Sequence, residues 1–297
     1  MTKVLALVGP TAAGKTELSL DIADRLGAEI VSVDSMQIYR GMDIGTAKPG
    51  PEERGRVAHH MLDLFDPRHD VTVAEFRQAA RSAIADIETR GKLPLLVGGS
   101  GLYFRAVVDG LEFPPRSEEI RAMWEGRAEE EGAEALHALL AGLDPRAAAK
   151  IEPGNARRTI RALEVIELTG RPFSESDAWD RYESIYDLRV AGLSGAREVL
   201  YERIAARVDE MVARGLIDEA KQVNEAGMSR SARQALGYRQ ILDAPDAPVA
   251  EIRDEIVRAT KRFARRQESW FKADPRVEWF DATDPGLEER LAPFLVA

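Results

Sequence analysis

The chain has 297 residues, a formal net charge of −10 and no cysteine. Its length suits about two structural units with a sizeable core. The lack of cysteine excludes disulfides, thiolate metal sites and cysteine nucleophiles. No apolar run approaches the roughly 20 residues that a membrane-spanning helix needs. The first such run, Val4 to Val8, is also too short for a secretory leader. We therefore expect a cytoplasmic protein with no membrane partner.

The charge is unevenly distributed along the chain. Residues 112–135 carry eight acids and three arginines, whereas residues 256–272 carry six bases and one acid. A strongly acidic total argues weakly against nucleic acid as a partner. A chain with a separate basic region can nevertheless hold a phosphate backbone on one side.

The N-terminal third alternates strand and helix patterns. Val4 to Val8 is a continuous apolar run, typical of a strand buried on both faces of a parallel sheet. A helical pattern over 16–26 follows, and 29–34 is the second predicted strand. A further helix over 73–89 leads to a third buried strand over 93–97. This order predicts an α/β fold with a P-loop-type parallel sheet and right-handed crossovers.

The hydrophobic pattern of the sequence changes at about Glu112, where helical periodicity replaces strand-like runs until about residue 185. A strand pattern returns near Asp187 and a long helix follows over 197–214. We interpret the middle segment as a helical insertion into the α/β core; the alternative is one continuous α/β domain with extra helices. The predicted organisation is a first part of the core over 1–111, a helical insertion over 112–185, and the rest of the core over 186–297. In that last part we expect helices over 216–226 and 248–272, a strand over 277–280 and a last helix from Gly286.

The motif between the first strand and the first helix fits G-x-x-x-x-G-K-[ST] in full. Its glycines let backbone N–H groups point at phosphate oxygens, and the helix N-terminus adds positive potential. Lys15 is expected to reach the terminal phosphates, and the Thr16 hydroxyl to ligate Mg²⁺. The predicted diphosphate site is Gly9, Pro10, Thr11, Ala12, Ala13, Gly14, Lys15 and Thr16.

The remaining motifs narrow the chemistry at that site. No Asn-Lys-x-Asp segment for reading guanine exists, and the strand over 93–97 ends in Gly98 and Gly99 rather than in an acid. Asp34, at the end of the second strand, could ligate Mg²⁺, deprotonate an acceptor, or cap a helix beside Ser35. Ligands of open α/β sheets collect at the carboxyl ends of the strands. The sequence therefore predicts group transfer from a diphosphate, as phosphoryl transfer or as transfer of a carbon group.

Motifs along nearly the whole chain make it resemble the tRNA dimethylallyltransferases, also called tRNA isopentenyltransferases. The matching stretches are GPTAAGKT over 9–16, DSMQIYR over 34–40, GTAKP over 45–49, HHMLD over 59–63, VGGSGLY over 97–103, NARR over 155–158 with RALEV over 161–165, QALGYR over 234–239, and TKRFARRQ over 260–267 followed by Trp270 and Phe271. Eukaryotic members often carry a zinc-finger extension. A chain without cysteine resembles the bacterial form.

The resemblance implies transfer of a dimethylallyl group from dimethylallyl diphosphate to N6 of adenosine 37 of tRNA. It also implies Mg²⁺ and an insertion that grips the anticodon stem-loop; we further expect a monomer. The exocyclic amine becomes acidic as it attacks, and Asp34 is the predicted base. By analogy with the family, Thr11 and Arg203 would stabilise the departing diphosphate, although Arg197 and Arg207 lie close to Arg203 in sequence.

The target adenine must swing out of the anticodon loop to reach such a site. Gln37 could pair with its edge through the amide, and Ser100, a threonine in most of the family, could donate a hydrogen bond nearby. Trp270 and Phe271 are expected to pack in the core, and the basic stretch over 256–272 to contact the RNA backbone. The predicted tRNA-binding residues are Asp34, Ser35, Met36, Gln37, Ser100, Arg121, Arg157, Arg158, Thr159, Ile160, Arg161, Gln234, Gly237, Tyr238 and Arg239.

Two other classes of protein fit parts of the pattern. A P-loop kinase of a small metabolite would use Asp34 as the base for an acceptor hydroxyl and would bind ATP. An RNA-binding module gated by a nucleotide would use the P-loop as a switch, but it leaves Asp34 without a role.

Overall fold

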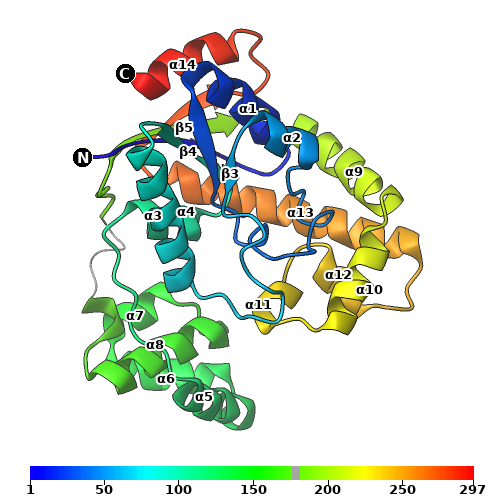
Figure 1. Ribbon diagram of the computed structural model, residues 1–297. Coiled ribbons are helices and arrows are strands. Elements are labelled where there is room, and N and C mark those ends of the chain that lie inside the picture. The colour runs from blue at the N-terminus through cyan, green and yellow to red at the C-terminus, as the bar shows by residue number, and fades with distance from the viewer. Residues whose placement is uncertain (176–180) are drawn as a thin grey trace. The chain divides into compact units, whose positions relative to one another are not determined.

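The computed structural model describes residues 1–175 and 181–297 (Figure 1). It separates into two compact units. Unit 1 consists of Met1–Asp109 and Glu183–Ala297, and unit 2 of Gly110–Tyr182. The helical insertion predicted over 112–185 overlaps most of unit 2, which starts two residues earlier and ends three residues earlier.

Unit 1 is built on a six-stranded parallel sheet in the order β3-β2-β4-β1-β5-β6. This confirms the predicted α/β class. In the register of the central strands, Leu5 of β1 lies opposite Leu95 of β4 and Arg189 of β5. The strands are β1 (Lys3–Val8), β2 (Ala28–Ser32), β3 (His59–His60), β4 (Leu93–Gly98), β5 (Asp187–Ser194) and β6 (Val277–Asp281).

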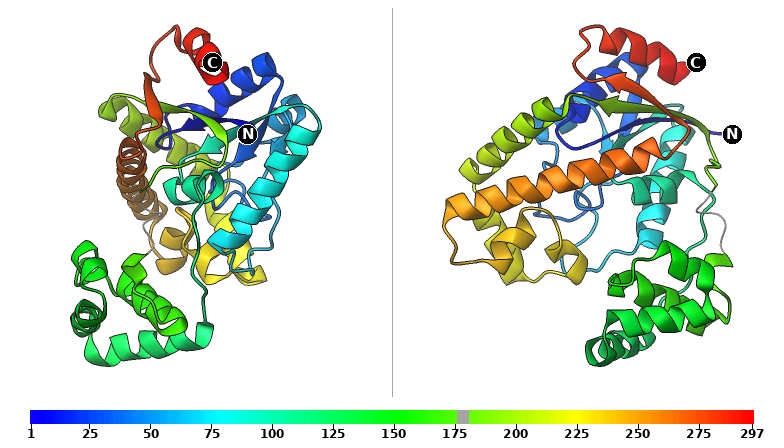
Figure 2. Two further views of the ribbon diagram at one scale, coloured as in Figure 1. Left: turned by 90° about the vertical axis from the view of Figure 1, so that its left-hand side faces the viewer. Right: turned by 180° about the vertical axis from the view of Figure 1, so that it is seen from behind.

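Helices cover both faces of this sheet, and β1 and its neighbours are therefore buried on both sides. On one face Leu5 and Leu7 pack with α1 (Lys15–Leu26) and α14 (Leu287–Val296). On the other face Val4 and Ala6 join a larger core. The helices of that second face are α3 (Val73–Thr89), α4 (Gly101–Val108), α9 (Arg197–Ala213) and α13 (Val249–Lys272), with α9 and α13 side by side (Figure 2).

Four short helices complete unit 1. They are α2 (Pro51–Arg56), α10 (Leu216–Ala226), α11 (Arg230–Arg233) and α12 (Tyr238–Asp243). Only α10 of these matches a helix expected from the sequence, since the others span six residues or fewer. Strand β2 ends at Ser32, two residues before the predicted end, although the Val33 N–H still donates to the Val97 carbonyl at 2.9 Å. Asp34 therefore lies in the turn that follows the strand.

Unit 2 is entirely helical in its described part. Its core includes Trp124, Leu136, Leu140 and Leu163. Asp144 accepts a hydrogen bond from Ala147 N at 3.0 Å, which caps the start of a helix as expected for an aspartate before proline. The elements are α5 (Glu118–Glu131), α6 (Ala133–Leu143), α7 (Pro145–Lys150), α8 (Ala156–Thr169) and the 3₁₀ helix Phe173–Glu175.

Among the described residues, no helix combines the length and the apolar character that crossing a membrane requires.

Candidate active site

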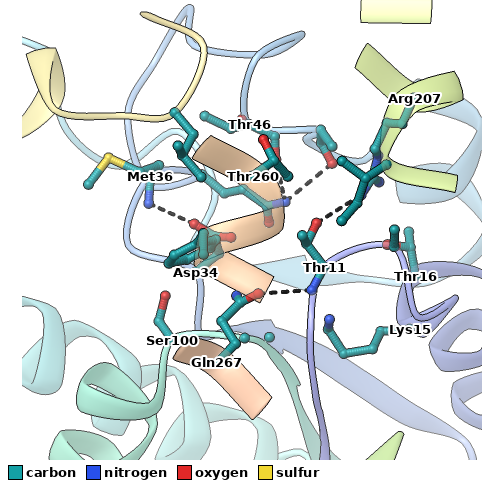
Figure 3. A pocket seen from close by; sticks show the side chains of 18 of the residues that line it. Thr11, Lys15, Thr16, Asp34, Met36, Thr46, Ser100, Arg207, Thr260 and Gln267 are labelled. Atoms are coloured by element: carbon teal, nitrogen blue, oxygen red, sulfur yellow. Dashed lines mark hydrogen bonds between the residues drawn. The ribbon is translucent and has the colours of Figure 1, made fainter. Parts of the chain in front are cut away.

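A cavity of about 1540 Å³ lies in unit 1 and is lined in part by the loops that follow β1, β2 and β4 (Figure 3). The P-loop forms one wall, with Thr11, Lys15 and Thr16 facing the cavity. The turn of Asp34 and the loop of Ser100 line it as well. The side chains predicted to converge at this edge of the sheet therefore do converge.

The P-loop connects β1 directly to α1. Gly14 is the N-cap of α1 and adopts φ +87°, a left-handed conformation that suits glycine. The Lys15 ammonium donates to the carbonyl oxygens of Gly9 at 2.9 Å and Pro10 at 2.7 Å. The backbone N–H groups at the start of α1 and this lysine together form an anion site.

The electrostatics of the site depend on Lys15. The pKa of its ammonium is lowered from 10.5 to about 7, chiefly by burial and also by the nearby Arg207 cation, while the Asp34 carboxylate opposes both. A bound polyanion would replace some of the lost solvation and favour the charged form. Lys15 is therefore poised to gain a proton when an anionic ligand arrives.

Asp34 faces the same cavity. One carboxylate oxygen accepts a hydrogen bond from Met36 N at 2.9 Å, and its own N–H donates to the Ser32 hydroxyl at 3.3 Å. Burial raises the pKa of the carboxyl group above its usual value, while the hydrogen bonds and the Lys15 and Arg207 cations partly offset that shift. A carboxylate with raised proton affinity suits a general base.

The arginine that reaches the P-loop is Arg207. Its guanidinium donates to the Thr11 hydroxyl at 3.3 Å. Burial lowers the pKa of Arg207, against the opposing effect of the Asp34 carboxylate. Arg203 is one turn earlier on α9; it lines the cavity, but its side chain is exposed and the structure gives it no hydrogen bond to Thr11. Both arginines line the cavity, so the predicted role of Arg203 at the diphosphate stays a prediction, while the contact with Thr11 favours Arg207.

Gln267 lies on α13 at the end of the 260–267 motif, and the sequence predicts no individual role for it. It is 5% exposed, and its Oε1 accepts a hydrogen bond from Thr11 N at 2.9 Å. It lies against Gly99, where an added Cβ would come within 2.1 Å of Gln267 Nε2. Only glycine at position 99 leaves room for this amide.

Both ends of the Gln37 amide are engaged within the protein. Its Oε1 accepts from the Ser32 hydroxyl at 2.8 Å, and its Nε2 donates to the carbonyls of Thr46 at 3.1 Å and Ala47 at 3.2 Å. Ser32 in turn accepts from Asp34 N. In this state Gln37 joins the 46–47 turn to the segment of Asp34.

The 43–45 segment is held by Glu219 of α10. Its carboxylate accepts from the N–H groups of Asp43 at 3.1 Å, Ile44 at 2.8 Å and Gly45 at 3.1 Å, and from the Tyr238 hydroxyl at 2.5 Å. A Cβ on Gly45 would approach the Tyr238 ring to 2.4 Å, so glycine permits this packing. Tyr238 is fully buried and, against the prediction, offers no free surface to RNA.

Most other residues predicted to bind tRNA divide between the two units. Ser35, Met36, Gln37, Ser100, Gln234, Gly237 and Arg239 line the cavity of unit 1. Unit 2 contains Arg121, Arg157, Arg158, Thr159, Ile160 and Arg161.

The residues of unit 2 differ in accessibility. Arg157 and Arg158 are exposed at the start of α8, whereas Thr159 and Ile160 are buried in that helix and cannot present side chains to RNA. Arg161 donates to the Pro114 and Pro115 carbonyls at 2.8 and 3.0 Å. The sequence pattern did not separate the exposed face of α8 from its buried face.

The two aromatic residues at the end of α13 differ in burial. Phe271 is 2% exposed and packs in the core as predicted. Trp270 is 39% exposed and lines the cavity, with its ring against Gly101. Core packing therefore holds for Phe271 and is wrong for Trp270.

The parallel sheet and this cavity define a P-loop α/β protein arranged for group transfer, with an anion site facing a carboxylate. A family model described as IPP transferase matches residues 37–274, and one described as isopentenyl transferase matches residues 2–67. The chain belongs to the IPP transferase family.

Named relatives agree with that membership. A Streptomyces coelicolor protein named tRNA dimethylallyltransferase is 53% identical over 93% of this chain and 89% of its own length. The crystal structure of a full-length tRNA isopentenylpyrophosphate transferase from Bacillus halodurans is 43% identical, covers 100% of this chain and 95% of that one, and gives a TM-score of 0.73. A eukaryotic dimethylallyltransferase described as acting on tRNA is 26% identical over 96% of this chain and 75% of that one, with a TM-score of 0.80.

Proposed function

We propose that this chain transfers a dimethylallyl group from dimethylallyl diphosphate to N6 of adenosine 37 in tRNA and releases diphosphate. One observation carries the proposal beyond family membership: Lys15, Thr11 and Arg207 line the same cavity as the half-buried carboxylate of Asp34. The cationic side suits a leaving diphosphate, and the carboxylate suits an amine that must lose a proton. The expectations of a cytoplasmic monomer remain predictions.

The chemistry assigns each group one task. The N6 nitrogen forms a bond to the dimethylallyl carbon while the bond from that carbon to the diphosphate oxygen breaks. Asp34 accepts the proton that N6 loses. Lys15, Arg207 and the Thr11 hydroxyl stabilise the negative charge that builds on the leaving oxygen, more strongly in the transition state than in the ground state.

Mg²⁺ belongs to the proposal through Thr16. The described residues contain no cluster of three histidine, aspartate or glutamate side chains that could hold a metal on its own. The Thr16 hydroxyl does line the cavity next to Lys15. Mg²⁺ commonly keeps several waters and binds through few protein ligands plus phosphate oxygens, so this donor set fits. When bound, the ion would help to neutralise the diphosphate.

The proposed function is tested by incubating the protein with unmodified tRNA and dimethylallyl diphosphate and analysing the digested nucleosides by mass spectrometry. The proposal requires an adenosine heavier by one dimethylallyl group at position 37. A P-loop kinase would instead be stabilised thermally by ATP and would leave the tRNA unchanged. A gated RNA-binding module would bind tRNA without forming any product.

Binding of the donor is expected to take up a proton. Because the pKa of Lys15 is about 7 without ligand, much of its amine is neutral at pH 8. The diphosphate favours the ammonium form, so uptake at pH 8 should approach about one proton per site and should fade as the pH drops below the pKa. Calorimetric titrations in two buffers of different ionisation enthalpy measure it. Lys15→Arg, whose side chain stays charged, should abolish the uptake; a wild-type heat that is independent of the buffer would contradict the assignment.

Affinity for the anticodon stem-loop is expected to depend steeply on salt. If at least six arginine and lysine contacts to phosphates form, affinity should fall by about 10³ or more between roughly 50 and 200 mM salt. Fluorescence anisotropy of a labelled stem-loop measures this slope. Replacing the exposed Arg157 and Arg158 together with alanine should make the slope shallower. A slope near zero in the wild-type protein would exclude the predicted arginine set.

A further inference from the structure

Of the two polar atoms of the Gln267 amide, only the oxygen forms a hydrogen bond with the described protein. Thr11 N is a donor, so the amide must turn its oxygen toward Thr11, which fixes the direction of the NH₂ group. Among the described residues, nothing accepts a hydrogen bond from Gln267 Nε2. In the described chain, the Thr159 hydroxyl is the only fully enclosed side-chain polar atom that lacks a hydrogen-bond partner. Gln267 Nε2, which has no partner either, is therefore not fully enclosed. Its free N–H groups therefore open into the cavity.

The position of this amide is tightly constrained. Gln267 is 5% exposed, so most of its side chain is packed within the protein while its NH₂ group faces the cavity. Gly99 must remain a glycine for the amide to fit, because a Cβ there would lie 2.1 Å from Nε2. A side chain that only anchored Thr11 would need an acceptor and no second polar group. The free NH₂ is thus available to a ligand in the cavity.

The surroundings indicate the chemistry of that ligand. The amide is fixed to Thr11, whose hydroxyl accepts from Arg207, and Lys15 lines the same side of the cavity (Figure 3). All of these groups can donate hydrogen bonds, and two are cations. A cluster of donors is complementary to anionic oxygens.

We propose that Gln267 is a donor-binding residue: its Nε2 donates a hydrogen bond to a diphosphate oxygen of the prenyl donor, while its Oε1 holds Thr11 and thereby the P-loop. This inference rests on the proposed function for the identity of the donor. The same side chain would then align the loop and bind the group that leaves, so that the P-loop and α13 clasp the diphosphate from two sides.

Two variants separate the binding role from the anchoring role. Gln267→Glu keeps an oxygen for Thr11 N but removes the NH₂ donor, and Gln267→Met removes both. Gln222→Glu is the control for the change in net charge alone, because Gln222 is exposed on α10 and lies outside the cavity lining. Inorganic diphosphate is the probe, its affinity is measured by calorimetry, and hydrogen–deuterium exchange over residues 9–16 reports on the anchor.

We expect Gln267→Met to bind diphosphate about 10- to 100-fold more weakly, as for loss of a hydrogen bond to a charged group. Gln267→Glu should bind more weakly still, because its carboxylate also repels the diphosphate. The Gln222 control should stay within about twofold, since it changes no group near the site. P-loop exchange should rise in Gln267→Met and stay as in the wild type in Gln267→Glu. If Gln267→Glu binds diphosphate as tightly as the wild type, Gln267 is an anchor only and the proposal is overturned. Failure of the proposed function would show separately, as absence of prenylated adenosine with the wild-type protein.

Discussion

Replacing Asp34 with asparagine is expected to lower the turnover of prenyl transfer by roughly 10²–10⁴, the usual contribution of a general base. Asparagine keeps an oxygen that can accept from Met36 N, so the turn after β2 should persist. It cannot accept the proton that N6 loses. Donor and tRNA affinities should therefore stay close to those of the wild type, and the loss should appear in the chemical step.

Single-turnover kinetics with saturating donor and tRNA measure that step. Asp246→Asn is a matched control, because Asp246 is exposed and lies outside the cavity lining. The wild-type rate should also fall as the pH is lowered through the raised pKa of Asp34, since the protonated acid cannot act as a base. The asparagine variant should lack that limb of the profile. Full turnover in Asp34→Asn would remove Asp34 from the role.

Replacing Arg207 with alanine is expected to cost about 10²–10³ in turnover, comparable to removing one preorganised donor from a site of developing charge. Arg207 contacts the Thr11 hydroxyl at 3.3 Å and lies close enough to lower the pKa of Lys15. Its loss leaves the leaving diphosphate with fewer cations, although Lys15 remains.

The comparison with Arg203→Ala makes this prediction specific. Arg203 lies one turn away on the same helix and is exposed, so its removal should cost much less than that of Arg207. Steady-state kinetics on both variants measure the difference. A larger loss in Arg203→Ala than in Arg207→Ala would contradict the assignment and would restore the arginine first predicted from the resemblance.

The residues that the sequence located correctly are those fixed by local structure. The P-loop is contiguous and lies between a buried strand and a helix, so its place in the fold follows from its pattern. Asp34 follows a buried strand, and the carboxyl ends of parallel strands meet at one edge of the sheet. Asp34 can therefore be placed beside Lys15 without any knowledge of tertiary packing.

The residues that the sequence left open or misplaced depend on contacts between distant segments. Arg203 and Arg207 are four residues apart on one helix, and only the packing of α9 decides which one reaches Thr11. Tyr238 is buried because it packs on Gly45, almost 200 residues earlier in the chain. Gln267 is one polar residue on a strongly basic helix, and its role emerges only from its contact with Thr11. Local patterns contain none of this information.

A structure of the protein with bound diphosphate tests the central claim most directly. The account predicts the diphosphate oxygens on the backbone N–H groups at the start of α1, on the Lys15 ammonium and on the Arg207 guanidinium, with the Asp34 carboxylate facing them across the cavity. Diphosphate bound away from Lys15, or an Asp34 side chain turned out of the cavity, would contradict it.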